Sequence, residues 1–335
     1  MNKKILKWTI CIAILLALLL AVSLFSFLVG VVDIPLSKIG EIIANGKSDS
    51  RFAILFDIRM PRIMLGFAIG GALSIAGVIL QGMFRNSLVE PYTLGISGGA
   101  ALGVCLNIVL KMQNIFGLFS LPIFGFMGGI CVILLVYALS VKQNVLRIQG
   151  LLLCGVMISF ICSSLIMLIM AVSRSEDLHG IIFWIMGSLE ESNWLLIKLM
   201  FMMSILGLIA AYIFCFDLNA FSLGEEEALH LGVNVERSKR ILFVLTSLLT
   251  GFSVSVAGII GFVGLIIPHF MRLIVGNDHR ILIVSSFLSG AIFLIFCDTI
   301  ARTIIAPIEF PVGVITGILG GTIFIYAFMK KTCLK

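Results

Sequence analysis

Long uncharged, apolar segments alternate with short charged ones along almost the whole chain. The uncharged runs cover residues 8–32, 63–84, 91–110, 112–141, 148–173, 199–216, 241–271, 281–297 and 310–329. A helix that crosses a membrane needs about 20 apolar residues. The nine runs therefore predict at least nine membrane-spanning helices, and the two longest runs have room for more.

The basic residues decide how many times the chain crosses. Lysines flank both outermost runs: Lys3, Lys4 and Lys7 precede the first, and Lys330, Lys331 and Lys335 follow the last. Because Lys and Arg are enriched on the cytoplasmic side of a membrane, both termini are expected there, and the number of spans must be even. We predict ten spans, at approximately 8–32, 62–84, 91–110, 118–141, 147–172, 193–216, 239–257, 260–273, 281–302 and 311–329.

The tenth span has to come from the run 241–271, which has basic residues at both ends. This run is too short for two full-length helices. We therefore expect one ordinary helix and one short or broken helix near Gly258, Gly261, Gly264 and Pro268. Close helix packing alone explains these glycines equally well.

Composition supports a membrane protein and argues against other classes. The mean hydropathy is +1.20, and 60% of the residues are hydrophobic. The net charge of +6 comes from short basic clusters between apolar runs, which is typical of juxtamembrane loops rather than of nucleic-acid binding. The eight cysteines have no C-x-x-C spacing and mostly lie in or beside apolar runs, so they are interpreted as small buried hydrophobic residues. The first run is longer than the apolar part of a signal peptide, which predicts an uncleaved helix.

A short sequence match suggests an internal repeat. Residues 74-SIAGVIL-80 in the second predicted span are similar to 255-SVAGIIG-261 late in the seventh. Spans that are five apart run in opposite directions, which is how the inverted repeats of many transporters are arranged.

The longest predicted cytoplasmic loop, residues 217–238, is strongly charged. Its segment 225-EEEALHLG-232 has helix-forming residues, carboxylates that suit the start of a helix, and Gly232 as a stop. Leu223, Ala228 and Leu231 give it a small apolar face. Such a helix at the membrane surface predicts a protein partner, and the alternative is a solvated loop with one helical turn.

Four segments of the chain resemble the FecCD family, the membrane permeases of ATP-binding-cassette (ABC) importers for ferric siderophores, haem and cobalamin. The segments are 59-RMPRIMLGFAIGGALSIAGVILQGMFRNSLVEPYTLGISGGAALG-103, 223-LGEEEALHLGV-233, 257-AGIIGFVGLIIPHFMRLIVGNDHR-280 and 298-DTIARTIIAPIEFPVGVITGILGG-321. They cover both halves of the chain in the family's order. The resemblance implies an all-α polytopic membrane protein with about ten transmembrane helices, of the cobalamin-importer-permease type (type II ABC importer), formed by a single permease domain over residues 1–335.

The resemblance also implies a coupling helix in the loop 217–238 that docks on a separate ATPase. The residues expected to make or support this contact are Gly224, Glu225, Glu226, Ala228, Leu231 and Gly232. Asn86 and Leu88 correspond to the family's cytoplasmic gate, although Ser87 stands where many relatives have proline. Losing that proline should loosen the turn slightly.

Three arginines are expected at the outer side, where the positive-inside rule disfavours them. They are Arg59 and Arg62, at the start of the second span, and Arg302, at the end of the ninth. The resemblance implies that such arginines receive a glutamate from each lobe of the substrate-binding protein, and we predict that these three are displayed as its socket. The alternatives are a lipid headgroup contact for Arg59 and Arg62 and a pair with Asp298 for Arg302.

Other candidates for chemistry are few. Asp298 and Arg302 have the spacing of a same-face pair, so a stabilising ion pair is favoured over a proton-coupling carboxylate. The four histidines make no metal-binding pattern. No G-x-x-x-x-G-K-[ST] phosphate loop is present, so ATP must be hydrolysed by another polypeptide.

The sequence therefore predicts a transport subunit without cofactors or enzymatic activity, in a bacterial or archaeal cytoplasmic membrane. The resemblance implies an ABC ATPase dimer, a periplasmic or lipoprotein substrate-binding protein and a second permease copy, identical or similar, as partners. A ferric siderophore is the first expected cargo, with haem or cobalamin as alternatives. An ion-coupled secondary transporter is the alternative from another class, and only Asp298 offers it an intramembrane carboxylate.

Overall fold

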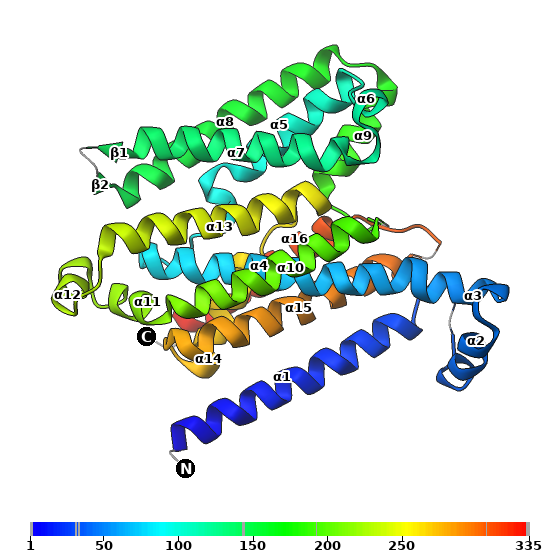
Figure 1. The fold of residues 1–335 in the computed structure, drawn as a ribbon, viewed down its shortest axis with the longest axis horizontal. Coiled ribbons are helices and arrows are strands. Elements are labelled where there is room, and N and C mark those ends of the chain that lie inside the picture. Colours follow the sequence, from blue (N-terminus) through cyan, green and yellow to red (C-terminus); the bar gives the residue numbers. More distant parts are fainter. Residues whose placement is uncertain are drawn as a thin grey trace.

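Most of the chain is helical, and the long helices run between the same two ends of one bundle (Figure 1). The computed structural model describes residues 3–30, 32, 34–142, 145–191, 193–305 and 307–332. The α-helices are α1 (Lys3–Leu28), α2 (Ile39–Asn45), α3 (Ser50–Ala53), α4 (Met60–Phe84), α5 (Ile96–Val109), α6 (Gln113–Phe116), α7 (Ser120–Ser140), α8 (Ile148–Val172), α9 (Ser175–Met186), α10 (Trp194–Ile213), α11 (Cys215–Phe221), α12 (Glu225–His230), α13 (Val235–Ala257), α14 (Val263–Val275), α15 (His279–Thr303) and α16 (Val312–Thr332).

The prediction of about ten spans is confirmed. Among the described residues, seven helices are long and apolar enough to cross a membrane, and three shorter apolar helices lie at 96–109, 263–275 and 312–326. Each of these ten helices overlaps one predicted span. One span is longer than predicted, because α3 and a π-helical stretch, Ile54–Arg59, extend α4 without a break.

The run 241–271 divides as predicted into the ordinary helix α13 and the short helix α14, which contains Pro268. Close packing explains two of the glycines there. A Cβ on Gly258, whose φ is +69°, would lie 2.1 Å from the carbonyl oxygen of Trp184, and a Cβ on Gly264 would lie 2.6 Å from Pro91 Cδ. Apart from Gly261 and its two chain neighbours, no atom of the described chain lies within 4 Å of a Cβ placed on Gly261.

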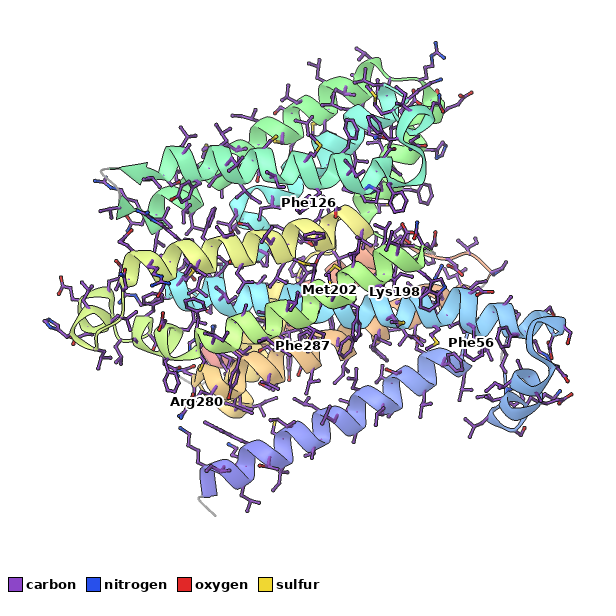
Figure 2. The ribbon with its side chains drawn as sticks, in the orientation of Figure 1. Phe56, Phe126, Lys198, Met202, Arg280 and Phe287 are labelled. Atoms are coloured by element: carbon purple, nitrogen blue, oxygen red, sulfur yellow. The ribbon has the colours of Figure 1, made fainter. Side chains whose placement is uncertain are left out.

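Helix α4 lies at the centre of the bundle. In the span Ser50–Phe84, which includes α4, 83% of an apolar 18-residue stretch is buried. Helix α4 contacts α15, α10, α13 and α14, and small residues permit the closest approaches. A Cβ on Gly77 would lie 1.8 Å from the carbonyl oxygen of Gly264. Phe287 of α15 lies in the interior (Figure 2), 5.2 Å from Phe67 of α4 between ring centroids in an edge-on arrangement.

The two copies of the predicted repeat differ in local structure. Residues 74–80 lie inside the continuous helix α4, whereas α13 ends at Ala257 and residues 258–261 are not helical. The seven-residue match therefore does not mark two equivalent helical segments.

The two ends of the bundle carry different short elements (Figure 1). One end, here called the α12 end, has α11, α12 and a hairpin of β1 (Val141–Lys142) and β2 (Val145–Leu146), in which Val141 pairs with Leu146. The opposite end, the α9 end, has α2, α3, α6 and α9. Apart from α12, these short helices were not predicted from the sequence, because the length of apolar runs detects spans and not helices of one to three turns.

Candidate functional site

The charged segment 217–238 folds around the predicted helix, α12. Gly224 is its N-cap with φ +136°, and Gly232 follows the helix with φ +84°. Both values favour glycine, which has no Cβ to clash with its own backbone. Glu225, Glu226 and Glu227 occupy the first turn, where the helix dipole stabilises negative charge.

An ion-pair network fastens α12 to the bundle. The carboxylate of Glu225 lies 2.6 Å from Nζ of Lys239 on α13, and Glu236 lies 3.5 Å from the same ammonium group. Glu236 also accepts a hydrogen bond of 2.9 Å from the backbone N–H of Leu146 in the β-hairpin. Lys239 is buried, so its charge depends on these carboxylates. Lys239 could not be identified as a site residue from the sequence, because no local pattern pairs it with Glu225.

The exposed face of α12 differs from the predicted one. Glu226 is exposed, and Leu231 is 64% exposed. Ala228, predicted to contact the ATPase, is fully buried. Its side chain packs against the interior of the permease, so it is not displayed at the surface as the prediction of an ATPase contact expected.

The predicted gate residues lie in a turn at the α12 end, residues 85–90, here called the gate turn. Arg85 ends α4 with a left-handed backbone, φ +49°. Asn86 Oδ1 then accepts a hydrogen bond of 2.9 Å from the N–H of Leu88, which is an Asx turn. This side-chain bond stabilises a turn that has Ser87 in place of proline. Leu88 is exposed.

The gate turn leads into a contact between two irregular segments. The hydroxyl of Tyr92 donates to the carbonyl of Ile260, at 2.9 Å, and accepts from the N–H of the same residue, at 3.1 Å. The segment before α5 is thereby tied to the segment before α14. Both are places where backbone groups lack helical partners and need others.

The three arginines that the sequence predicts at the outer side are all at the α9 end, but the structure buries them. Arg59 is 2% exposed. Its Nη1 donates to the carbonyl oxygens of Phe27 and Leu28, at 2.8 and 2.7 Å, and its Nη2 donates to that of Val32. These carbonyls include the last ones of α1, which have no partner within the helix. Arg59 therefore holds the end of α1 against the start of α4.

Arg62 and Arg302 belong to one charged cluster. Arg62 is 8% exposed, and its guanidinium lies 2.6 Å from Glu309, 3.3 Å from Glu190 and 3.9 Å from Asp298. Arg302, 4% exposed, donates to Asp298 at 2.9 Å and to Ser26 Oγ at 2.9 Å. The prediction that these arginines are displayed outward as a socket is corrected: each is engaged by groups of its own chain.

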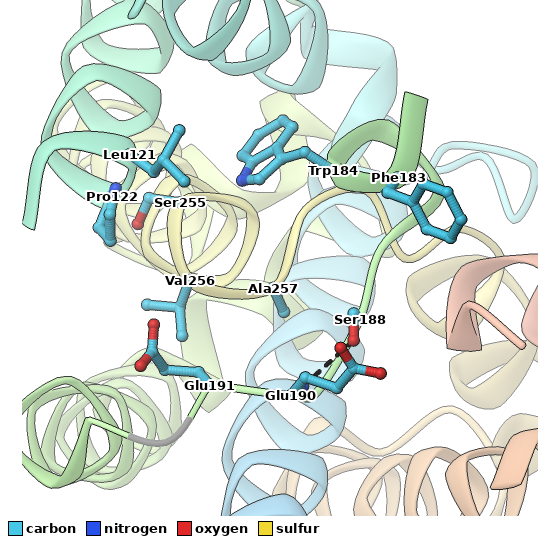
Figure 3. Close-up of a pocket in the computed structure, with 10 residues that line it drawn as sticks. All are labelled: Leu121, Pro122, Phe183, Trp184, Ser188, Glu190, Glu191, Ser255, Val256 and Ala257. Carbon is cyan, nitrogen blue, oxygen red and sulfur yellow. Dashed lines mark hydrogen bonds between the residues drawn. The ribbon is translucent and has the colours of Figure 1, made fainter. Parts of the chain in front are cut away.

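A pocket of about 340 Å³ opens at the same end (Figure 3). Phe183 and Trp184 of α9 lie on one side of it, and Glu190 and Glu191 on the other. The N–H of Glu190 donates to Ser188 Oγ at 3.2 Å. In the described part of the chain, no three His, Cys, Asp or Glu side chains are close enough to hold a metal ion.

The comparisons with known proteins point to one family. The FecCD transport family matches residues 18–330. The chain belongs to the FecCD transport family. The hemin transport system permease protein HmuU of Yersinia pestis is 37% identical over 323 residues, covering 95% of this chain and 94% of HmuU. The Fe(3+) dicitrate transport system permease protein FecD of Escherichia coli is 34% identical over 322 residues, covering 96% and 99%.

A solved structure agrees with the family. A transporter described as metal-chelate type ABC, in an inward-facing conformation, superimposes with a TM-score of 0.84 at 31% identity, covering 96% of this chain and 99% of that one. The resemblance inferred from the sequence motifs is confirmed. This FecCD-family chain is a multi-pass membrane permease of an ABC transport system.

Proposed function

We propose that this chain is the transmembrane permease subunit of an ABC importer that carries an iron chelate, with a ferric siderophore as first candidate, across the cytoplasmic membrane of a bacterium or archaeon. The observation that carries the proposal is α12. It is a short helix held to the bundle by the 2.6 Å pair of Glu225 and Lys239, and it exposes Glu226 and Leu231 on a FecCD-family chain. Such a helix can transmit force from a docked ATPase without bending.

The α12 end is the cytoplasmic side in this proposal. The start of α1 lies there, because Lys4 pairs with Asp278 at 3.1 Å, and Figure 1 places the end of α16 at the same end. Both helices carry lysines at these ends, as expected of cytoplasmic termini. An ATPase dimer docks on α12 and neighbouring surfaces, while a second permease copy, identical or similar, completes the pathway.

A periplasmic or lipoprotein substrate-binding protein docks at the α9 end. Of the three predicted arginines, Arg62 best suits a role in this contact. Its partner Glu190 has a side chain that is 61% exposed, so a glutamate of the docking protein can replace it at the Arg62 guanidinium. Arg59 and Arg302 instead hold α1 and α15 in place.

The cargo class rests on the relatives. The hemin and Fe(3+) dicitrate permeases named above both carry iron complexes by their names, which favours an iron chelate. Haem is the second candidate because of the similarity to the hemin permease, and cobalamin is the third, from the family resemblance.

Reconstitution tests the proposal. The permease, its ATPase and its binding protein are placed in liposomes, and uptake of a ferric siderophore, haem and cobalamin is measured with and without internal ATP. We expect ATP-dependent uptake of a ferric siderophore. Uptake that needs an ion gradient but no ATPase would instead identify a secondary transporter, and uptake of haem or cobalamin alone would reassign the cargo.

A further inference from the structure

A second polar pocket, of about 290 Å³, lies at the α12 end beside the gate turn. Its walls come from the end of α4, the gate turn, the end of α14, the start of α15 and Ser222, two residues before the N-cap of α12. No acidic side chain lines it, whereas Arg85 and Arg272 both do. Here it is called the arginine pocket.

In the part of the chain that the structure describes, the two arginines have no counter-charge. Among the described residues, no carboxylate lies within ion-pair distance of Arg85 or Arg272. Arg272 donates to Oε1 of Gln81 at 2.5 Å, and Gln81 Nε2 donates in turn to the carbonyl of Leu265 at 3.1 Å. Gln81 thus fixes the Arg272 guanidinium without neutralising it. Two unneutralised guanidinium groups in one polar pocket favour an anion.

Besides the two arginines, the pocket contains a histidine nitrogen that lacks a hydrogen-bond partner in the described chain. His279 is 2% exposed, and its Nδ1 lies 2.8 Å from Asn219 Oδ1, which also accepts from the backbone N–H of His279. Since Asn219 Oδ1 is an acceptor, Nδ1 carries the hydrogen. The other nitrogen, Nε2, is buried without a hydrogen-bond partner in the described chain. Buried polar atoms usually have one.

Glycine keeps the space in front of this nitrogen open. A Cβ on Gly82, another residue of the pocket wall, would lie 3.0 Å from His279 Nε2. A hydrogen phosphate group fits both features, because its charged oxygens accept from the arginines and its hydroxyl donates to the imidazole.

We propose that the arginine pocket binds a phosphate-type oxyanion, held by Arg85 and Arg272 and completed by His279 Nε2. The group can come from free phosphate or from an anionic lipid headgroup, since basic pockets between the cytoplasmic ends of membrane helices bind such headgroups. A lipid phosphodiester has no P–OH, so in phosphatidylglycerol a hydroxyl of the headgroup glycerol donates to His279 Nε2 instead. The bound anion bridges the gate turn, α14 and α15, and the segment that precedes α12. Its binding does not depend on which cargo is transported.

Binding of radiolabelled inorganic phosphate to the delipidated full-length permease tests this site. The wild type is compared with Arg85→Gln and Arg272→Gln, and with Arg237→Gln as a control, since Arg237 is an exposed arginine near the same end that does not line the pocket. We expect saturable binding that weakens roughly tenfold or more in either pocket variant and is unchanged in the control. No saturable binding, or equal weakening in all three variants, would overturn the proposal.

A second charge-removing variant guards against misfolding. Arg85→Gly suits the left-handed backbone at this position, φ +49°, so it should fold at least as stably as the wild type and still lose phosphate binding. Unchanged phosphate binding in a well-folded Arg85→Gly protein would remove Arg85 from the site.

Two further arms identify the source of the phosphate group. In nanodiscs, phosphatidylglycerol should compete with phosphate if a headgroup is the natural occupant, and phosphatidylcholine alone should not; equal phosphate binding in both discs assigns the site to the free anion. The ATPase complex is the last arm. Complete loss of phosphate binding when the ATPase docks would show that the site is closed in the assembled transporter, which would overturn the proposal for the working importer.

Discussion

Arg302 donates a hydrogen bond from Nε to Oδ2 of Asp298, one turn earlier on α15, at 2.9 Å. The same-face pair expected from the sequence is confirmed, and both side chains are buried. Nη2 of Arg302 donates a hydrogen bond to Ser26 Oγ on α1, and the Asp298 carboxylate also forms an ion pair with Arg62 on α4. A single carboxylate thus organises three helices at the α9 end.

Removing one partner of this pair should be costly. We expect Asp298→Ala to destabilise the permease by about 3–5 kcal/mol, because it leaves the Arg302 charge buried. The double variant Asp298→Ala/Arg302→Ala should lose less than the sum of the single variants. Thermal unfolding in detergent measures this, with the exposed Glu176→Gln as a control. Additive losses would show that the two residues do not act as a pair.

The exposed face of α12 should decide ATPase docking. We expect Leu231→Asp to weaken ATPase binding by roughly 1–3 kcal/mol, because a charge is placed in an apolar contact. The exposed change Glu226→Gln should cost less than about 1 kcal/mol. Co-purification and ATPase affinity give the readout. Ala228→Trp should instead impair folding, since Ala228 is buried. We expect it to lower the thermal stability of the permease more than its affinity for the ATPase.

Among the arginines at the α9 end, Arg62 should contribute most to docking of the substrate-binding protein. Arg62→Gln is expected to weaken docking by about 1–3 kcal/mol, with a smaller dependence on salt than the wild type, because a charged contact is lost. Arg174, exposed near the same end, supplies the control variant Arg174→Gln. If only the control weakens the affinity of the binding protein, the contact lies at α9 rather than at Arg62.

Topology can be tested with two exposed serines. Ser48 lies near the α9 end and Ser222 at the α12 end, and both are exposed. In a background without the native cysteines, Ser48→Cys should react with an impermeant maleimide in intact cells, and Ser222→Cys should react only after lysis. Reaction of Ser222→Cys from outside would reverse the proposed orientation.

Asp278 should make the attachment of α1 sensitive to acid. The guanidinium of Arg280 holds the pKa of Asp278 well below its usual value, and Lys4 and Asn219 add to this effect. Because the pKa is lowered in the folded state, the ion pairs stabilise the protein above the usual carboxyl pKa of about 3.9 and lose this effect as the pH falls through the folded-state pKa. Asp278→Asn should therefore lower the unfolding temperature at pH 7 and make little difference in strong acid. An equal deficit at both pH values would rule out this charge effect.

The spans and the family were within reach of the sequence because both depend on local patterns. The length of an uncharged run sets whether a helix can cross a membrane, and the basic residues on both sides of 241–271 required the extra crossing that α13 and α14 provide. Gly232 likewise marked the end of α12. Helix ends were less accurate: α1 begins at Lys3 rather than at residue 8, since its first turn contains lysines.

Only the tertiary structure decided which charged residues are available to partners. Arg62 lies next to Glu309, 247 positions away in the chain, and no spacing rule connects two residues that distant. Leu223, Ala228 and Leu231 form one apolar face by sequence, yet only Ala228 packs inward while the two leucines are exposed, because a short helix buries whichever side meets the bundle. The sequence by itself determined how often this protein crosses the membrane and to which family it belongs. Which arginines are paired, and where two of them lie around His279 with no carboxylate of the described residues in ion-pair distance, followed from helices brought together by packing.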